Sequence, residues 1–199
     1  MLIAVIDYGM GNVASVQKGL NYLGIPSKLT RKKEEIEQAN GIILPGVGAF
    51  TQGMENLKAF GLIPVLNGEV LVNKKPILGI CLGMQLLATY GTEIEHCKGL
   101  GYIDGVQTAI QEENKVIPHL GWNEIKVKSG DRLERFDQKD FYFIHSFHFK
   151  VKNPRDVTGT VNYGKDYVAI VRKGHIVGVQ FHPEKSQKLG LEMLSMLLN

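Results

Sequence analysis

The chain has 199 residues, 44% of them hydrophobic, and its 23 Lys and Arg against 20 Asp and Glu leave a formal charge of +3. Such a chain can bury a substantial core but is short for two full domains, so we expect one domain over residues 1–199. Its basic residues are dispersed, which argues against nucleic-acid binding. The opening apolar run, residues 2–6, is too short for a signal peptide or a membrane span, so we expect a cytoplasmic protein without membrane contact.

The two cysteines, Cys81 and Cys97, are not expected to form a disulfide in that compartment. Without histidines at ligand spacing they are also too few for a zinc site, and we expect neither a metal nor another cofactor. Each thiol must therefore be judged by its own surroundings. We interpret Cys97, in a polar stretch, as incidental.

The first half of the chain alternates short apolar runs with helical patterns. Strands are predicted at residues 2–6, 27–30, 42–44 and 77–80, and each is followed by a predicted helix, at residues 13–23, 32–38, 54–73 and 84–90. This alternation is typical of a parallel sheet covered by helices.

The second half of the chain changes character. Residues 141–149 and 167–171 alternate as antiparallel strands do, and Lys173-Gly174 stands where a tight hairpin would turn. A last amphipathic helix should close the fold, since apolar residues recur at helical spacing at Leu189, Met193, Met196 and Leu197. The whole pattern predicts a doubly wound α/β fold with a mixed sheet and an active site at the carboxyl ends of the parallel strands.

Cys81 lies in the sequence Gly-Ile-Cys-Leu-Gly, between the apolar residues 76–78 and the helical run 84–87. This strand, sharp turn and helix are the context of a nucleophile elbow, where glycines let strand and helix approach while the central residue adopts a strained backbone. The helix N-terminus would stabilise a Cys81 thiolate. The alternative is a buried structural cysteine, as most free cysteines are.

His182 ends the apolar run 178–181 and is followed by a proline, which ends the strand, and by Glu184. A base at that point can meet a nucleophile from another strand end, and Glu184 can fold back to hold the imidazole in one tautomer. The residues therefore predict a triad of Cys81, His182 and Glu184. Taken singly, His182 could be a hydrogen-bonded loop histidine and Glu184 a solvated carboxylate beside Lys185.

Residues 44–50 form a strand end that opens into a glycine-flanked turn. The oxyanion that develops when a thiolate attacks an amide needs backbone N–H donors. We expect one donor from Leu82, the residue after the nucleophile, and another from the turn at Val47 and Gly48. The alternative is that Gly46 and Gly48 only shape the loop.

Residues 76–85 and 178–186 together resemble the class I, or triad-type, glutamine amidotransferases. Three further segments, residues 7–12, 45–50 and 118–123, are similar to the glutaminase subunits of imidazole glycerol phosphate synthase within that family. The resemblance covers essentially the whole chain. It implies a flavodoxin-like doubly wound mixed sheet, to which the antiparallel C-terminal segments form an extension.

The resemblance also implies a function. Glutamine would be hydrolysed to glutamate and ammonia, and the ammonia would pass to a cyclase subunit, a (β/α) barrel, in a heterodimer. The cyclase would convert a phosphoribulosyl formimino nucleotide into imidazole glycerol phosphate and an aminoimidazole carboxamide ribotide in histidine biosynthesis. The triad alone does not identify the acceptor, so a paralogous glutaminase that feeds another cytosolic synthase stays open.

Several pocket residues take their roles only from this resemblance. The glutamine pocket would be lined by Gln85, His145, Ser146 and Phe147, and Glu93 would bind the amino group of the substrate. Phe147 departs from the tyrosine that is common in the family. A hydroxyl contact is then lost, while a backbone contact survives.

Asn12 and Trp122 lie in segments that resemble partner-facing loops of the family. Each has an ordinary alternative, because Asn12 could cap the first helix and Trp122 could belong to the core.

A different enzyme class is suggested by residues 9–14, Gly-Met-Gly-Asn-Val-Ala, which fit the dinucleotide fingerprint between a strand and a helix. The acidic ribose ligand is expected near residues 29–32, where the chain has Thr30, Arg31 and Lys32 instead. Only an NADP-binding oxidoreductase would be consistent with these residues, and it would leave Cys81 unexplained.

Two further alternatives are weaker. A metal hydrolase built on His119, His145 and His148 is disfavoured because residues three apart on one alternating strand face opposite sides of the sheet. A non-enzymatic binding module that merely keeps the fold would be expected to lack Cys81 or His182, and both are present.

Overall fold

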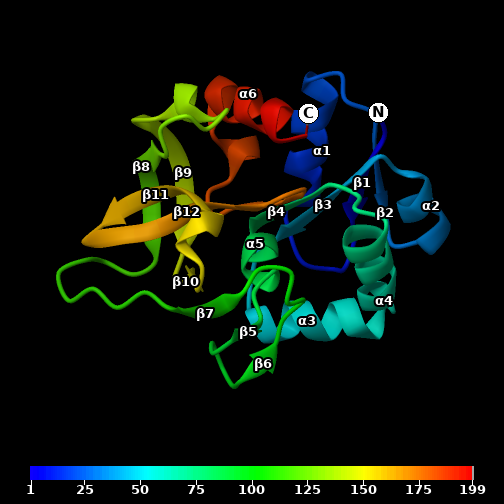
Figure 1. The fold of residues 1–199 in the computed structure, drawn as a ribbon, viewed down its shortest axis with the longest axis horizontal. Helices are drawn as coiled ribbons and strands as arrows, with labels where there is room; N and C mark the ends of the chain where they lie inside the picture. Colours follow the sequence, from blue (N-terminus) through cyan, green and yellow to red (C-terminus); the bar gives the residue numbers. More distant parts are fainter. Residues whose placement is uncertain (199) are drawn as a thin grey trace.

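The computed structural model describes residues 1–198, and within that range the chain forms a nine-stranded mixed sheet with helices on both faces (Figure 1). The order of its strands is β2-β1-β3-β4-β13-β12-β11-β8-β9. Their bounds are β1 (Ile3–Ile6), β2 (Ser27–Thr30), β3 (Gly41–Gly46), β4 (Ile77–Cys81), β8 (His119–Val127), β9 (Lys139–His145), β11 (Val157–Tyr163), β12 (Lys165–Lys173) and β13 (Ile176–Val179).

The first five strands of that order are parallel to one another, and the rest pair antiparallel from β13 outwards. Strand β1 lies between β2 and β3, which is the flavodoxin-like order and differs from the order of dinucleotide-binding folds. The predicted doubly wound mixed sheet and its antiparallel extension are therefore confirmed. The hairpin at Lys173-Gly174 is confirmed too, since Gly174 joins β12 to β13 with φ +60°.

The helices divide between the two faces of the sheet (Figure 1). Helix α1 (Val13–Tyr22) and helix α6 (Gln187–Leu198) cover one face, and their Val16, Leu20, Met193 and Leu197 share a core cluster with the sheet. The other face is covered by α2 (Lys33–Gln38), α3 (Phe50–Ala59), α4 (Leu62–Asn67) and α5 (Leu82–Leu86). Successive side chains of β1 pack into the two core clusters on opposite faces of the sheet. Ile3 and Val5 belong to one cluster, and Ala4 and Ile6 belong to the other.

Two predicted helices have other bounds in the structure. The run 54–73 starts earlier, at Phe50, and breaks at Gly61, whose left-handed φ of +65° separates α3 from α4; a π-helical turn (Gly68–Val72) completes it. The run 84–90 begins at Leu82 and is shorter, because Tyr90 pairs with strands of another sheet. A periodic apolar pattern continues through both breaks and does not reveal them.

The prediction of one strand over residues 141–149 is wrong. Strand β9 ends at His145, and after a bend at Ser146 the chain continues as β10 (Phe147–Val151) in a second sheet. That sheet has the order β10-β7-β5-β6, with β5 (Tyr90–Gly91), β6 (Cys97–Lys98) and β7 (Gly105–Ala109). Alternation hides the break because both halves keep one face buried. Short 3-10 turns at Glu134–Phe136, Pro154–Asp156 and Pro183–Lys185 complete the described elements.

Candidate active site

Cys81 stands at a sharp turn between the end of β4 and the start of α5, with φ +54° and ψ −111°. This left-handed backbone is costly for a residue with a side chain. It is maintained by a close crossing of strand and helix, since a Cβ on Gly79 would lie 2.7 Å from the Gly83 carbonyl and a Cβ on Gly83 would overlap the Leu44 carbonyl. The glycine spacing therefore does what the sequence predicts and forms a nucleophile elbow.

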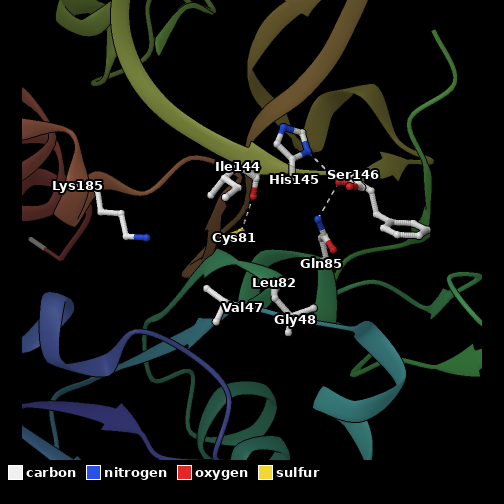
Figure 2. A pocket seen from close by; sticks show the side chains of 10 residues that line it. Val47, Gly48, Cys81, Leu82, Gln85, Ile144, His145, Ser146 and Lys185 are labelled. Carbon is white, nitrogen blue, oxygen red and sulfur yellow. Dashed lines mark hydrogen bonds between the residues drawn. The ribbon is translucent and has the colours of Figure 1, made fainter. Parts of the chain in front are cut away.

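A cavity of ≈ 230 Å³ opens in front of Cys81 (Figure 2). It is smaller than pockets for drug-sized ligands, and suits a compact substrate better than a nucleotide. Its lining residues come from four regions far apart in sequence: Val47, Gly48, Cys81, Leu82, Gln85, Ile144, His145, Ser146, Phe147 and Lys185. The structure thus brings together the expected nucleophile, oxyanion donors and most of the expected pocket residues.

His182 and Glu184 lie behind the cavity and form a buried pair. Nδ1 of His182 lies 2.8 Å from Oε1 of Glu184, and both side chains are 2% exposed. The backbone of His182 is tied to β9, because its N–H donates to the Tyr142 carbonyl and its own carbonyl accepts from the Ser186 hydroxyl. The imidazole is therefore fixed at both its ring and its backbone.

The electrostatics of His182 follow from its two acidic neighbours. Burial alone lowers the pKa of His182, but the Cys81 thiol and the Glu184 carboxylate outweigh it and raise this pKa to about 9. The other ring nitrogen, Nε2, is buried and has no hydrogen-bond partner of ordinary geometry in the described residues. The sulfur of Cys81 lies 3.8 Å from the Ile144 carbonyl instead. The ring thus keeps one nitrogen available for proton transfer.

The expected oxyanion donors face the same cavity. Leu82 is the first residue of α5, where backbone N–H groups have no partner within the helix. Val47 and Gly48 line the cavity on the same side as Leu82, across from Ile144 and His145 (Figure 2), and Gly48 has a left-handed φ of +106°. Gly46 is more than a loop former, because a Cβ there would lie 2.8 Å from the Cβ of Leu82.

The wall of the pocket is organised around the Phe147 carbonyl. This oxygen accepts from Nε2 of Gln85 at 2.9 Å and from Nδ1 of His145 at 2.8 Å. Nε2 of His145 lies 3.0 Å from Nδ1 of His119, so the imidazole is fully engaged in the wall. Burial lowers the pKa of His145 to about 3 and keeps the ring neutral. Ser146, at the bend between the two sheets, adds a polar edge to the cavity.

Three expected functional residues lie away from the cavity. Glu93 accepts from the backbone N–H of Phe50 at 2.7 Å, at the start of α3. Asn12 is exposed and caps α1, since its Oδ1 accepts from the Ser15 N–H. Trp122 is 45% exposed on β8, with its ring at the edge of Tyr142. The alternative that Trp122 is a core residue is wrong, and Asn12 is both a cap and accessible.

Other residues at the site carry no functional expectation from the sequence. Ile144 and Lys185 line the cavity, and Gln180 lies behind it with its side chain against Cys81. Gln180 had one usable signal, because it is a polar residue inside an otherwise apolar strand end. Ile144 and Lys185 had none, since neither residue type stands out in its segment.

The histidines proposed for a metal site are separated in an unexpected way. His119 and His145 touch, while His148 packs against the Tyr167 ring. The sequence predicted that His145 and His148 face opposite sides of one strand. That reason is wrong, because the chain bends at Ser146 and the two histidines lie on different strands. Within residues 1–198 no three His, Cys, Asp or Glu side chains gather as metal ligands would.

The loop that fits the dinucleotide fingerprint is filled by protein. A Cβ on Gly11 would lie 3.4 Å from the Cα of Gly46, so the loop packs on the end of β3. Arg31, the residue that could accept a ribose phosphate, pairs with Asp7 and lies over the Phe60 ring. Together with the strand order, these contacts do not support an NADP site.

The model of the glutamine amidotransferase class-I family matches residues 4–197. The chain belongs to this family. Among curated relatives, this class-I glutamine amidotransferase is 46% identical to the imidazole glycerol phosphate synthase subunit HisH 1 of Campylobacter jejuni, over 97% of each chain. It is 44% identical to the HisH subunit of Moorella thermoacetica, over 96% of this chain and 91% of the relative.

Solved structures agree on the fold. A glutamine amidotransferase crystal structure that is 20% identical superposes with a TM-score of 0.75 over 98% of this chain and 97% of the other. At this identity the match speaks for the fold alone. No helix in residues 1–198 of this class-I glutamine amidotransferase is long and apolar enough to cross a membrane.

Proposed function

We propose that the chain is the glutaminase subunit of an imidazole glycerol phosphate synthase, which hydrolyses glutamine to glutamate and ammonia for a docked (β/α)-barrel cyclase. One observation carries the chemistry: a cysteine in a strained strand-to-helix turn faces a small pocket and interacts with a buried histidine–carboxylate pair. The HisH names of its relatives support the acceptor. We further propose that residues 1–199 form one domain and work in the cytoplasm without cofactor.

In the proposed mechanism the Cys81 thiolate attacks the side-chain amide carbon of glutamine. The oxyanion accepts hydrogen bonds from the N–H groups of Leu82 and of the Val47-Gly48 turn. His182, held protonated by its acidic neighbours, gives its proton to the departing nitrogen, and ammonia leaves. A glutamyl thioester on Cys81 remains.

In the second half His182 removes a proton from water, which hydrolyses the thioester to glutamate and restores the thiol. Glu184 keeps the ring oriented in both halves through its bond to Nδ1. The wall formed by Gln85, Ser146 and Phe147 would hold the substrate, and Glu93 would reach its amino group only after a rearrangement, because it now binds the Phe50 N–H.

Ammonia in bulk water would largely be protonated and lose its nucleophilicity. A docked partner with a sealed path is therefore physically sensible. Trp122 and Asn12 are our proposed contacts with that partner, since both are exposed and Trp is a frequent anchor in protein interfaces.

The test is glutamate release from glutamine by the purified chain, with and without the barrel cyclase and its nucleotide substrate. Strong hydrolysis only with the loaded partner supports the proposal. Equal hydrolysis with and without the partner favours a free amidase or another acceptor synthase. No hydrolysis in any mixture overturns the glutaminase assignment.

A further inference from the structure

Gln180 is a fully buried amide between β13 and His182, where the flanking residues are apolar. Both ends of its side chain are engaged. Oε1 accepts from Nε2 of Gln85 at 2.9 Å, and Nε2 lies 3.7 Å from the sulfur of Cys81. A single amide thus joins the nucleophile to a side chain of the pocket wall.

The direction of these bonds follows from an atom that can only accept. The Phe147 carbonyl oxygen lies 2.9 Å from the Gln85 amide, so Gln85 must present its NH2 group there. The second N–H of that same nitrogen points at Gln180 and requires an acceptor, which can only be Oε1. Gln180 must then turn its own NH2 group towards Cys81. The orientation of both amides is fixed by the backbone at Phe147.

An N–H donor at the sulfur matters because the sulfur also lies near a backbone carbonyl, which can only accept. The Ile144 carbonyl, 3.8 Å away, favours the S–H form and repels a thiolate. The Gln180 N–H has the opposite preference, since hydrogen bonds from N–H to an ionised acceptor are about twice as strong as neutral ones. Gln180 therefore supports the thiolate as a side-chain donor, alongside the positive charge of His182, whose pKa Cys81 helps to raise.

We propose that Gln180 is a positioning residue of the glutaminase reaction, which supports the Cys81 thiolate through its N–H and orients the Gln85 amide through its carbonyl. The same two bonds leave Oε1 of Gln85 as the free polar atom of that side chain, available to a donor group of glutamine. This inference rests on the proposed function and adds a residue to it.

The experiment compares the full chain with Gln180→Met, a side chain of similar length that can neither donate nor accept in this way. Alkylation by iodoacetamide at neutral pH is followed at Cys81 and Cys97 by peptide mass spectrometry. We expect Cys81 to react about tenfold more slowly, as the loss of a hydrogen bond to a charged atom implies. Cys97, half-buried in another segment, should react at the original rate and serves as an internal control.

A second variant separates the two ends of the amide. Gln180→Glu keeps an acceptor towards Gln85, so the KM for glutamine should stay near the original value while kcat falls. In Gln180→Met the KM should rise and kcat should fall together. A purely structural role would change thermal unfolding and both kinetic constants in both variants, without this split.

The outcomes are distinct from those of the proposed function. The proposal is overturned if the Gln180→Met chain, folded by circular dichroism, alkylates at Cys81 at the original rate or hydrolyses glutamine with unchanged kinetic constants. Absence of glutamine hydrolysis in the unaltered chain with its loaded partner would instead overturn the glutaminase function, whatever the alkylation rates.

Discussion

At the residue scale, the proposed catalysis depends on the carboxylate charge of Glu184, which is buried away from water. Glu184 does not line the cavity, and we assign it an effect only through His182, whose Nδ1 it holds at 2.8 Å. Its second carboxylate oxygen is buried without a hydrogen-bond partner among the described residues. Burying a carboxylate in this way is costly unless an opposite charge compensates it. The imidazolium of His182 supplies that charge.

Replacing Glu184 with Gln keeps the shape of the side chain and removes the charge. The pKa of His182 should then fall, because one of the groups that raise it is gone. We expect kcat for glutamine hydrolysis to drop on the order of 10²-fold, the scale of a lost general acid–base contribution. Steady-state glutamate release measures it, and an unchanged kcat would remove Glu184 from the mechanism.

At the element scale, the site depends on how closely β3, β4 and α5 approach one another. Gly83, in the first turn of α5, lies against the Leu44 carbonyl, and Gly46 ends β3 against Leu82. The atoms met are a backbone carbonyl and the Cβ of Leu82, whose position the backbone fixes, so no side-chain rotation can relieve these two contacts. The strained turn at Cys81 is the consequence of this crossing.

We therefore expect Gly83→Ala to lower the free energy of unfolding by about 2 kcal/mol or more, as overpacking does. It should also reduce glutamine hydrolysis by displacing Cys81. Gly68→Ala is the matched control, because Gly68 has helical angles and open space around its Cα, and alanine should stabilise it by up to about 1 kcal/mol. Urea unfolding of both variants checks the pair; equal stabilities would contradict the close-crossing account.

Some structural elements could be predicted from the sequence and others could not, depending on whether the signal is local. The elbow at Cys81 and the doubly wound sheet are encoded locally, by glycine spacing and by strand–helix alternation, whereas the flavodoxin-like order was expected only from the family resemblance. The bend at Ser146 is not, since β9 and β10 share one alternating pattern and are divided only by their partners, His119 for His145 and Ala109 for Phe147. Gln180 was missed for a similar reason, because its role depends on Gln85 and Cys81, nearly a hundred positions away in sequence.

At the scale of the whole molecule, a buried histidine, His145, and a half-buried one, His148, make the fold sensitive to acid. Burial lowers the pKa of His145 to about 3 and that of His148 to about 4. In the unfolded chain a histidine titrates near about 6.5. Between these values the unfolded state holds the extra proton, so the contribution of these two histidines to stability is complete above about pH 6.5 and is lost as the pH falls towards the folded-state pKa values.

Between about pH 7.5 and about pH 5.5 we expect His145 and His148 each to lower the free energy of unfolding by roughly 1 kcal/mol, while His182, whose pKa is raised to about 9, contributes a gain of similar size. Urea titrations at the two pH values measure it. The variant His148→Gln should show a shallower dependence than the original chain. If the two chains lose equal stability on acidification, His148 is not buried in neutral form.

The central claim is that Cys81, and not Cys97, attacks the side-chain carbonyl of glutamine, and covalent labelling tests it most directly. The chain is treated with a glutamine analogue that carries a chloromethyl ketone in place of the amide, and the modified peptide is identified by mass spectrometry. The account predicts one label per chain at Cys81, protection by excess glutamine, and no labelling of Cys81→Ser. A label at Cys97, or one at Cys81 that glutamine does not prevent, would contradict it.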